Sequence, residues 1–435
     1  MKRHVPYWLL LLALCLLCGC YVKQSDAPTK PVTGQEQPEY HTGATTAPSA
    51  QEASVMEPNY TFWQDNRSST YLLTGLPSSD GKGFYFRDTT LKYYDISQQA
   101  SFTPCARPGC THTDESCPNF IAGLLDLLEA DGLLYAFCED QTARRLRLLR
   151  INPADGERSV LYELRWSDER ESSPLWSTCF YSSGRIYATV SNVTNGAETL
   201  FLCVTLADGS VTELAQTSET TTGGLLGAYG DCVLLEWTTY SMAPPEFDAY
   251  LAENPGKNEE DYYSFLYGFH KKYATQEVRR LDVTTMEYTD IQSMLCSGSN
   301  AEALNTRADA GIPCYGQYLL YTVGKSICRY SLATQQVETL VSDINFTYRY
   351  QYDGRLFYGT KNGQKMQCHI LDLQTGAEIT LHNNGNTEYV EFGIYDETAE
   401  AFIGYYNGKQ CWITKEDYYA ERYDKAVSYD VRDYG

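Results

Sequence analysis

The sequence predicts an all-β fold in which one short unit of strands is repeated along most of the chain. Two observations lead to this fold class: a turn glycine followed by a tyrosine-rich strand recurs, and a second strand ending in a polar turn follows each copy. The chain has 435 residues, of which 37 are tyrosines and 43% are hydrophobic. This composition is that of a globular protein with enough apolar surface for a large core.

The first half of the unit is a tight turn followed by a strand in which large apolar residues alternate. Glycine supplies the positive φ angle that such a turn requires, and tyrosine, phenylalanine, leucine, isoleucine or valine follows it closely. A weaker copy without the glycine runs from Asp396 into Phe402. The turn glycines of the six clear copies are Gly81, Gly132, Gly184, Gly230, Gly316 and Gly354.

The second half of the unit is a strand that ends in a polar turn and leads into an outer strand. Asp-Gly and Thr-Gly pairs, as at Gly156, Gly209 and Gly376, are signals for a β-hairpin. Each unit is therefore a four-stranded antiparallel sheet, and the sheets recur about every 40–55 residues. The outer strands are expected at residues 159–164, 211–214, 338–341 and 378–381.

Repeated four-stranded sheets at this spacing are typical of a β-propeller, and we predict one with seven blades over residues 59–435. The same repeats also allow six or eight blades, and a pair of β-sandwiches is the alternative fold. Closure of the ring is expected from the segment after Asp417, which either pairs with another blade or caps an edge. The blades are expected at residues 69–105, 119–164, 174–215, 223–291, 310–341, 344–382 and 387–420.

The fourth blade contains an insertion, Tyr240 to Ala274, that interrupts the repeat. Its apolar residues have helical spacing, with acids at the start and Lys271 and Lys272 near the end, as the helix dipole favours. The sequence therefore predicts a short helical segment at one face of the propeller. Loops on one face are where propellers commonly build a binding surface, and a lid that only stabilises the fold is the other interpretation.

The N-terminal segment has the form of a lipoprotein export signal. Lys2 and Arg3 precede an apolar stretch that is too short to span a bilayer of about 30 Å, and the segment ends in Leu17-Cys18-Gly19-Cys20. This ending resembles the bacterial lipobox. The resemblance implies that residues 1–19 are a cleaved signal peptide and that Cys20 carries the lipid. Residues 20–58 are rich in Thr, Pro, Ala and Gln and predict a disordered tether.

Charge narrows the partners that this protein can have. Asp and Glu total 56 against 34 Lys and Arg, which gives a formal net charge of −22. Nucleic-acid binding is not expected, because contacts to phosphates need clustered basic residues. The same charge is repelled by anionic lipid, so the lipid on Cys20 is expected to hold the protein at the outer face of the cell membrane. The sequence leaves the oligomeric state open.

One cysteine-rich segment follows the first predicted blade. Cys105, Cys110, His112 and Cys117 fall within thirteen residues, and thiols with an imidazole are the donors that zinc prefers. The alternative is a disulfide staple, in which two of these cysteines pair and the third pairs elsewhere, for instance with Cys138. We expect the staple and keep a zinc site as the alternative, so no cofactor is required. The cysteines within strands are expected to be small buried residues.

This segment and its surroundings resemble a known group of proteins. The spacing Cys-x4-Cys-x-His-x4-Cys at residues 105–117 follows a Tyr-Tyr-Asp strand at residues 93–95, and a lipobox and a low-complexity tether precede both. This arrangement resembles lipid-anchored β-propeller lipoproteins of Clostridia-type Gram-positive bacteria. Only residues 93–118 carry a specific motif. The resemblance implies the location and the fold, and it brings no activity with it.

Motifs of catalysis are missing from the sequence. It has no Gly-x-Ser-x-Gly elbow, no His-Glu-x-x-His helix and no glycine-rich phosphate loop. We therefore expect a binding or scaffolding module whose tyrosine-rich surfaces contact an envelope protein, peptide or glycan. The alternative is a hydrolase or lyase that acts on envelope glycans or peptides at the central channel. Acids or histidines that converge at one mouth of the channel would favour the enzyme.

Overall fold

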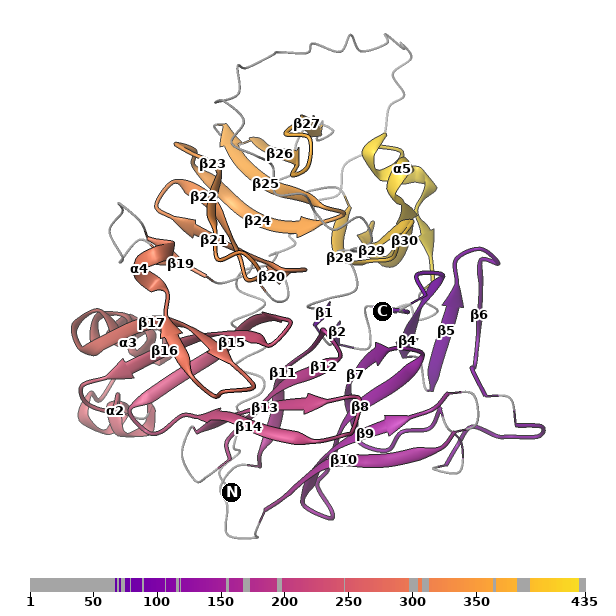
Figure 1. Cartoon of the computed structure of the whole chain (residues 1–435), viewed down its shortest axis with the longest axis horizontal. Helices are drawn as coiled ribbons and strands as arrows, with labels where there is room; N and C mark the ends of the chain where they lie inside the picture. The colour runs from indigo at the N-terminus through magenta and orange to yellow at the C-terminus, as the bar shows by residue number, and fades with distance from the viewer. Residues whose placement is uncertain are drawn as a thin grey trace. The chain divides into compact units, whose positions relative to one another are not determined.

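The computed structural model (Figure 1) describes most of the chain after residue 66. The predicted signal peptide, Cys20 and the tether lie outside the described residues, so their predictions stay predictions. No helix among the described residues is long and apolar enough to cross a membrane. The described ranges are 67–68, 70–71, 75–78, 80–87, 90–105, 107–114, 117, 119–153, 156–166, 173–193, 198–245, 247–296, 304–306, 313–362, 365–381 and 392–429.

The described residues form seven small antiparallel sheets arranged in a ring, which is a seven-bladed β-propeller (Figure 1). The predicted fold class and blade count are confirmed. The strands of the first three blades are β3 (Leu76–Pro77), β4 (Gly83–Arg87), β5 (Leu91–Asp95) and β6 (Ala100–Phe102); β7 (Leu124–Ala130), β8 (Leu133–Asp140), β9 (Arg145–Ile151) and β10 (Arg158–Arg165); and β11 (Leu175–Ser182), β12 (Arg185–Ser191), β13 (Thr199–Thr205) and β14 (Val211–Gln216).

The remaining four blades follow in chain order. Their strands are β15 (Thr221–Tyr229), β16 (Cys232–Tyr240), β17 (Ala274–Asp282) and β18 (Tyr288–Asp290); β19 (Leu304–Asn305), β20 (Cys314–Tyr315), β21 (Tyr318–Val323), β22 (Ser326–Ser331) and β23 (Val337–Val341); β24 (Phe346–Tyr352), β25 (Arg355–Asn362), β26 (Lys365–Asp372) and β27 (Glu378–Leu381); and β28 (Gly393–Glu397), β29 (Ala401–Tyr406), β30 (Lys409–Thr414) and β31 (Val427–Ser428).

The turn between the first two strands of a blade has the geometry that the sequence predicts. In the second, third and sixth blades, both central residues of the turn have positive φ: Asp131 and Gly132, Ser183 and Gly184, and Asp353 and Gly354. Positive φ at both positions defines the type I′ turn, whose twist matches that of the flanking strands. These turns fix the register of their hairpins, with Ser182 paired with Arg185 in the third blade and Tyr352 with Arg355 in the sixth.

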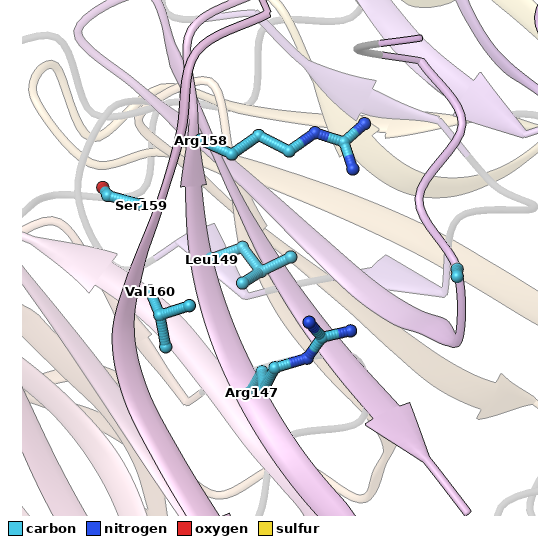
Figure 2. A pocket seen from close by; sticks show the side chains of 6 residues that line it. Arg147, Leu149, Arg158, Ser159 and Val160 are labelled. Atoms are coloured by element: carbon cyan, nitrogen blue, oxygen red, sulfur yellow. The ribbon is translucent and has the colours of Figure 1, made fainter. Parts of the chain in front are cut away.

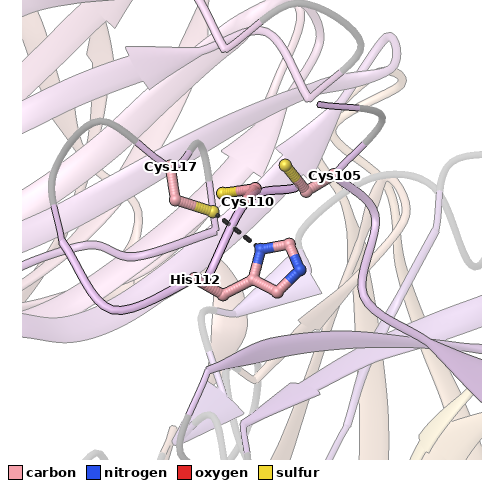
Figure 3. Close-up of side chains that lie close together, drawn as sticks. All are labelled: Cys105, Cys110, His112 and Cys117. Carbon is pink, nitrogen blue, oxygen red and sulfur yellow. Dashed lines mark hydrogen bonds between the residues drawn. The ribbon is translucent and has the colours of Figure 1, made fainter. Parts of the chain in front are cut away.

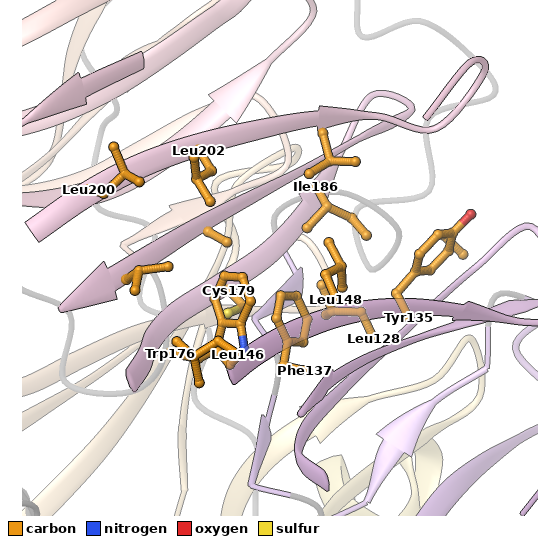
Figure 4. Packing of buried hydrophobic residues seen from close by; sticks show 14 residues of the cluster. Leu128, Tyr135, Phe137, Leu146, Leu148, Trp176, Cys179, Ile186, Leu200 and Leu202 are labelled. Atoms are coloured by element: carbon orange, nitrogen blue, oxygen red, sulfur yellow. The ribbon is translucent and has the colours of Figure 1, made fainter. Parts of the chain in front are cut away.

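A hydrophobic cluster fills each interface between neighbouring blades. Figure 4 shows the cluster between the second and third blades, where Phe137 and Trp176 meet edge to face at 5.1 Å. Equivalent clusters lie at each of the remaining junctions around the ring. The last of them packs Phe84 and Tyr94 of the first blade against Trp412 and Tyr429 of the last. The ring therefore closes through side-chain packing between its first and last blades, and the strands of each of these two blades are contiguous in sequence.

Three predicted blade boundaries are wrong. The first blade was expected from residue 69, but β2 (Thr70–Tyr71) pairs with β7 of the second blade, and β1 (Arg67–Ser68) pairs with β11 of the third. The fifth blade begins earlier than 310, because β19 pairs with the end of β21. The last blade extends beyond 420, because β31 pairs with β30 and covers its outer edge. Two-residue strands have no apolar period, so sequence pattern did not show them.

Helices are few in the part of the chain that the structure describes, and the two longest of them lie in the predicted insertion of the fourth blade. A capping box between Asn258 and Asp261 starts α3, and its basic residues lie in the last turn. Because β16 and β17 are antiparallel, the insertion lies at the end of the blade opposite the β15–β16 turn. The helical segments are α2 (Phe247–Glu253), α3 (Glu259–Tyr273), α4 (Gln292–Leu295), α5 (Lys415–Tyr419) and the 3-10 helix η2 (Tyr423–Lys425).

Candidate metal centre

The cysteine-rich segment forms the connection between the first and second blades, from β6 to β7. Its described residues have no regular secondary structure and fold through tight turns. The Cys110 N–H donates to the carbonyl of Arg107 at 3.3 Å, and the Cys117 N–H donates to that of Asp114 at 3.0 Å. Gly109 and His112 both have positive φ, 72° and 58°. Left-handed backbone at these two positions turns the chain back on itself.

These turns bring all four candidate ligands together. One donor atom from each of Cys105, Cys110, His112 and Cys117 lies within 4.8 Å of the others. His112 Nδ1 is 3.1 Å from the Cys117 sulfur, and Figure 3 shows the four side chains around one small volume. Cys117 is buried and the other three are partly exposed. The four residues of the zinc alternative therefore lie together, while Cys138, named as a possible partner in the disulfide staple, lies in the core strand β8 outside the cluster.

The protein environment acts differently on two of the thiols. The backbone N–H of His112 donates a hydrogen bond to the Cys110 sulfur and lowers the pKa of this thiol, and the charge of Arg107 adds to the effect. Burial raises the pKa of Cys117 to about 11. The Asn119 N–H donates a hydrogen bond to the Cys117 sulfur at 3.4 Å, which partly opposes this rise. A divalent cation would favour the thiolate form at both positions, since metal ligation deprotonates a thiol.

The segment is fixed to both blades that it joins. Arg158 of β10 donates from Nη2 to the carbonyl oxygens of Cys117 and Phe120, at 2.5 and 2.8 Å. On the other side, the Leu91 N–H of β5 donates to the carbonyl of Asn119 at 3.4 Å. The backbone of this connection therefore contacts both the first and the second blade. An ion held by the four ligands would cross-link the connection between these two blades.

Two acids from neighbouring blades, Glu397 and Asp353, converge in a buried ion network. Glu397, which is 2% exposed, lies 2.8 Å from Lys415 Nζ and accepts hydrogen bonds from the Tyr315 hydroxyl and the Asp353 N–H. Lys415 also lies 2.9 Å from Asp353, which accepts from Tyr419 at 2.8 Å. Burial raises the pKa of Glu397, and Lys415 opposes this effect. Sequence reasoning missed this network, which ties the fifth, sixth and seventh blades together.

Comparison with known proteins supports no closer assignment than the fold. No protein-family model matches the chain, and no curated protein matches it either. Among solved structures, it is similar to an oligogalacturonate lyase in complex with manganese, with a TM-score of 0.46, 10% identity, and coverage of 79% of this chain and 89% of that one. It is also similar to the β-propeller domain of the Trilobed protease from Pyrococcus furiosus, with a TM-score of 0.42, 8% identity, and coverage of 80% of this chain and 91% of that one.

A third similar structure is the oligogalacturonate lyase from Vibrio parahaemolyticus, with a TM-score of 0.44, 8% identity, and coverage of 77% of this chain and 86% of that one. At such low identity and with TM-scores below 0.5, these similarities carry no argument about this chain. What this chain does has to be argued from its own residues.

Proposed function

We propose that this protein is a lipid-anchored β-propeller of the cell envelope that acts as a binding or scaffolding module, with a structural zinc ion at the junction of its first two blades. The observation that carries the proposal is the cluster of three thiols and one imidazole within 4.8 Å. Four protein ligands complete a tetrahedral shell and leave no open position, which is the arrangement of a structural site rather than a catalytic one.

Zinc fits this cluster better than a disulfide does, for two reasons. Tetrahedral zinc with Zn–S distances of about 2.3 Å separates its sulfur ligands by about 3.8 Å, which lies within the observed spread. A disulfide also leaves His112 without a role, whereas a metal ion uses it as the fourth donor. The left-handed backbone of His112 turns its ring toward Cys117, and such a conformation is uncommon for a residue other than glycine.

A binding role is supported by the insertion of the fourth blade. Three large apolar side chains are exposed there: Met242 at 51%, Tyr263 at 37% and Tyr267 at 66%. Lys271 stacks over the Tyr267 ring at 4.5 Å, which holds the ring on the surface. Tyrosine offers a large contact area with a polar tip, and this suits an envelope protein, peptide or glycan as the partner.

The partner is tested by affinity capture from the envelope fraction of the parent organism, with the full chain purified in a mild non-ionic detergent. Replacing both Tyr263 and Tyr267 by Ser should abolish capture of a partner that the unaltered chain retains. Tyr288→Ser is the matched control, since Tyr288 is 56% exposed on β18, outside the insertion. Equal capture by all three proteins would contradict a binding role for the insertion.

The anchor is tested separately, because it depends on Cys20 alone. The unaltered chain should incorporate radiolabelled palmitate and sediment with membranes, and Cys20→Ala should do neither. Cys18→Ala, the neighbouring thiol, should behave like the unaltered chain. Labelling that persists in Cys20→Ala would show that the proposed lipobox is not the site of lipidation.

A further inference from the structure

A small cavity of about 180 Å³ opens on the second blade, beside the segment that carries the cysteines. Figure 2 shows that the guanidinium groups of Arg147 and Arg158 extend to the same side of the sheet, with Leu149 between them. The hydroxyl of Ser159 points the other way, so Ser159 contributes backbone. The residues that line the cavity are Ala122, Arg147, Leu149, Arg158, Ser159 and Val160.

The charge of this lining is opposite to that of the whole chain. Two of its residues are arginines and, among the described residues that line it, there is no acid, whereas the chain has a formal net charge of −22. The Nε atom of Arg147 is buried and has no hydrogen-bond partner among the described residues. A buried charged donor without a partner is costly, so the cavity offers a favourable place for an oxyanion.

The two acids whose pKa Arg147 helps to lower, Glu163 and Asp140, are held by other arginines. Glu163 lies directly across from Arg147 in the β9–β10 ladder, but its oxygens are 2.6 Å from Arg165 and 3.6 Å from Arg145. Asp140 likewise pairs with Arg145, at 3.0 Å. Arg147 therefore keeps donors available on the side that faces the cavity.

The second guanidinium is rigidly placed. Two carbonyl oxygens, of Cys117 and Phe120, accept hydrogen bonds from Nη2 of Arg158 and fix its plane. Its guanidinium places a fixed positive charge at the wall of the cavity, and this charge attracts the oxygens of a carboxylate or phosphate. Leu149 and Val160 supply an apolar wall between the two arginines.

From this arrangement we propose that the cavity is a binding site for the oxyanion group of a small acidic ligand, either a carboxylate or a phosphate ester on a small organic body. The volume is below the roughly 300–1,000 Å³ of sites for drug-sized molecules, so it takes one such group or the end of a longer acidic chain. The donors of this site are arginine side chains and none of the proposed metal ligands, although Arg158 contacts the carbonyl of Cys117.

Calorimetric titration of the full chain in mild non-ionic detergent at about 100 mM salt tests the proposal, since weak surface attraction is largely screened there. The probes are glucuronate, glucose 6-phosphate and, as the neutral control, glucose. At least one of the two anions should bind saturably with a stoichiometry of one, and glucose should not bind. Binding of only one anion assigns the ligand class, and binding of neither overturns the proposal.

Variants locate the site. Arg147→Gln should weaken the binding of the anion at least tenfold, and Arg147→Lys should restore part of it, because lysine keeps the charge but not the fork. Arg150→Gln is the matched control: it makes the same charge change in the same strand, but Arg150 pairs with Ser159 and faces away from the cavity. Val160→Asp, at a side chain 55% exposed, should also weaken binding without disturbing the fold. Equal affinities for the unaltered chain, Arg147→Gln and Val160→Asp would overturn the assignment.

Discussion

At the scale of single residues, the buried network around Glu397 joins positions that are far apart in sequence. Glu397 is 44 residues from Asp353 and 82 from Tyr315, and both contact it. Acids, lysines and tyrosines are common in this chain, so nothing in the sequence distinguished these. The cysteine cluster is the opposite case, since its ligands are close in sequence and their residue types already indicate a metal or a disulfide. Only the folded backbone places the His112 ring beside Cys117.

Removing the cation of the buried network should destabilise the protein strongly. Lys415→Met keeps most of the side-chain volume but leaves Glu397 as a buried charge without a cation, and we predict a loss of about 3–5 kcal/mol in the free energy of unfolding. Urea denaturation measures it. The control is Lys425→Met, which should cost about 0–1 kcal/mol, because the Lys425 side chain is 61% exposed and its amine is 3.8 Å from Asp424. Similar losses for the two variants would show that the network does not stabilise the fold.

A second residue gives a prediction about pH. Hydrogen bonds from His369 at 2.9 Å and Tyr358 at 2.8 Å hold the pKa of Glu378 below its ordinary value of 4.5. The folded state therefore binds fewer protons at Glu378 than the unfolded state does. Its contribution to stability is complete above the ordinary value and is lost as the pH falls through the folded-state pKa.

We therefore expect the unaltered chain to lose more stability than Glu378→Gln between about pH 5 and pH 3, because Gln cannot titrate in this range. Urea denaturation at a series of pH values measures the difference. Parallel pH profiles for the two proteins would contradict the assigned role of Glu378.

At the scale of elements, the sequence located nearly every hairpin because each depends on local chemistry. The turn glycines marked the inner strands, and Asp-Gly and Thr-Gly marked the outer ones, as at Gly209 and Gly376 with φ near 72°. The helical insertion was found from spacing and charge. The short strands β1 and β2 were missed, because their pairing with β11 and β7 is decided by backbone hydrogen bonds and not by side-chain pattern.

Two glycines of the last blade should respond differently to the same substitution. A Cβ atom at Gly404 would overlap the carbonyl oxygen of Gly393 and press on the Phe392 ring, whereas a Cβ atom at Gly393 meets nothing within 4 Å. We predict that Gly404→Ala destabilises the protein by about 3 kcal/mol, since this contact is with backbone in a packed core. Gly393→Ala should change the stability by less than about 1 kcal/mol. Thermal unfolding of both variants measures this, and equal melting temperatures would count against the close approach of β28 and β29 at Gly404.

At the scale of the whole molecule, the ring has no strand shared between its first and last blades among the described residues. Closure depends instead on one aromatic cluster. In it the ring centroids of Phe84 and Tyr429 lie 4.6 Å apart, and those of Tyr94 and Trp412 lie 6.2 Å apart. The sequence predicted that the last segment would either close the ring or cap an edge. It caps an edge, since β31 covers β30 of its own blade, and Tyr429 adds side-chain packing on the first blade in place of a shared strand.

Loss of this cluster should affect the two blades that it joins. Trp412→Ala is expected to cost about 3–5 kcal/mol and to raise amide hydrogen exchange in the first and last blades. Trp176→Ala, at the junction of the second and third blades, should cost a similar amount but raise exchange there. Exchange that rises uniformly in both variants would show that the ring opens as one unit.

The most direct test of the account is to count metal in the purified full chain by mass spectrometry and to read its ligands by X-ray absorption at the zinc edge. We predict one zinc ion per chain with three sulfur and one nitrogen neighbours, and loss of that nitrogen signal in His112→Ala. A chain that is folded, free of zinc and oxidised at two of Cys105, Cys110 and Cys117 would contradict the proposed metal centre.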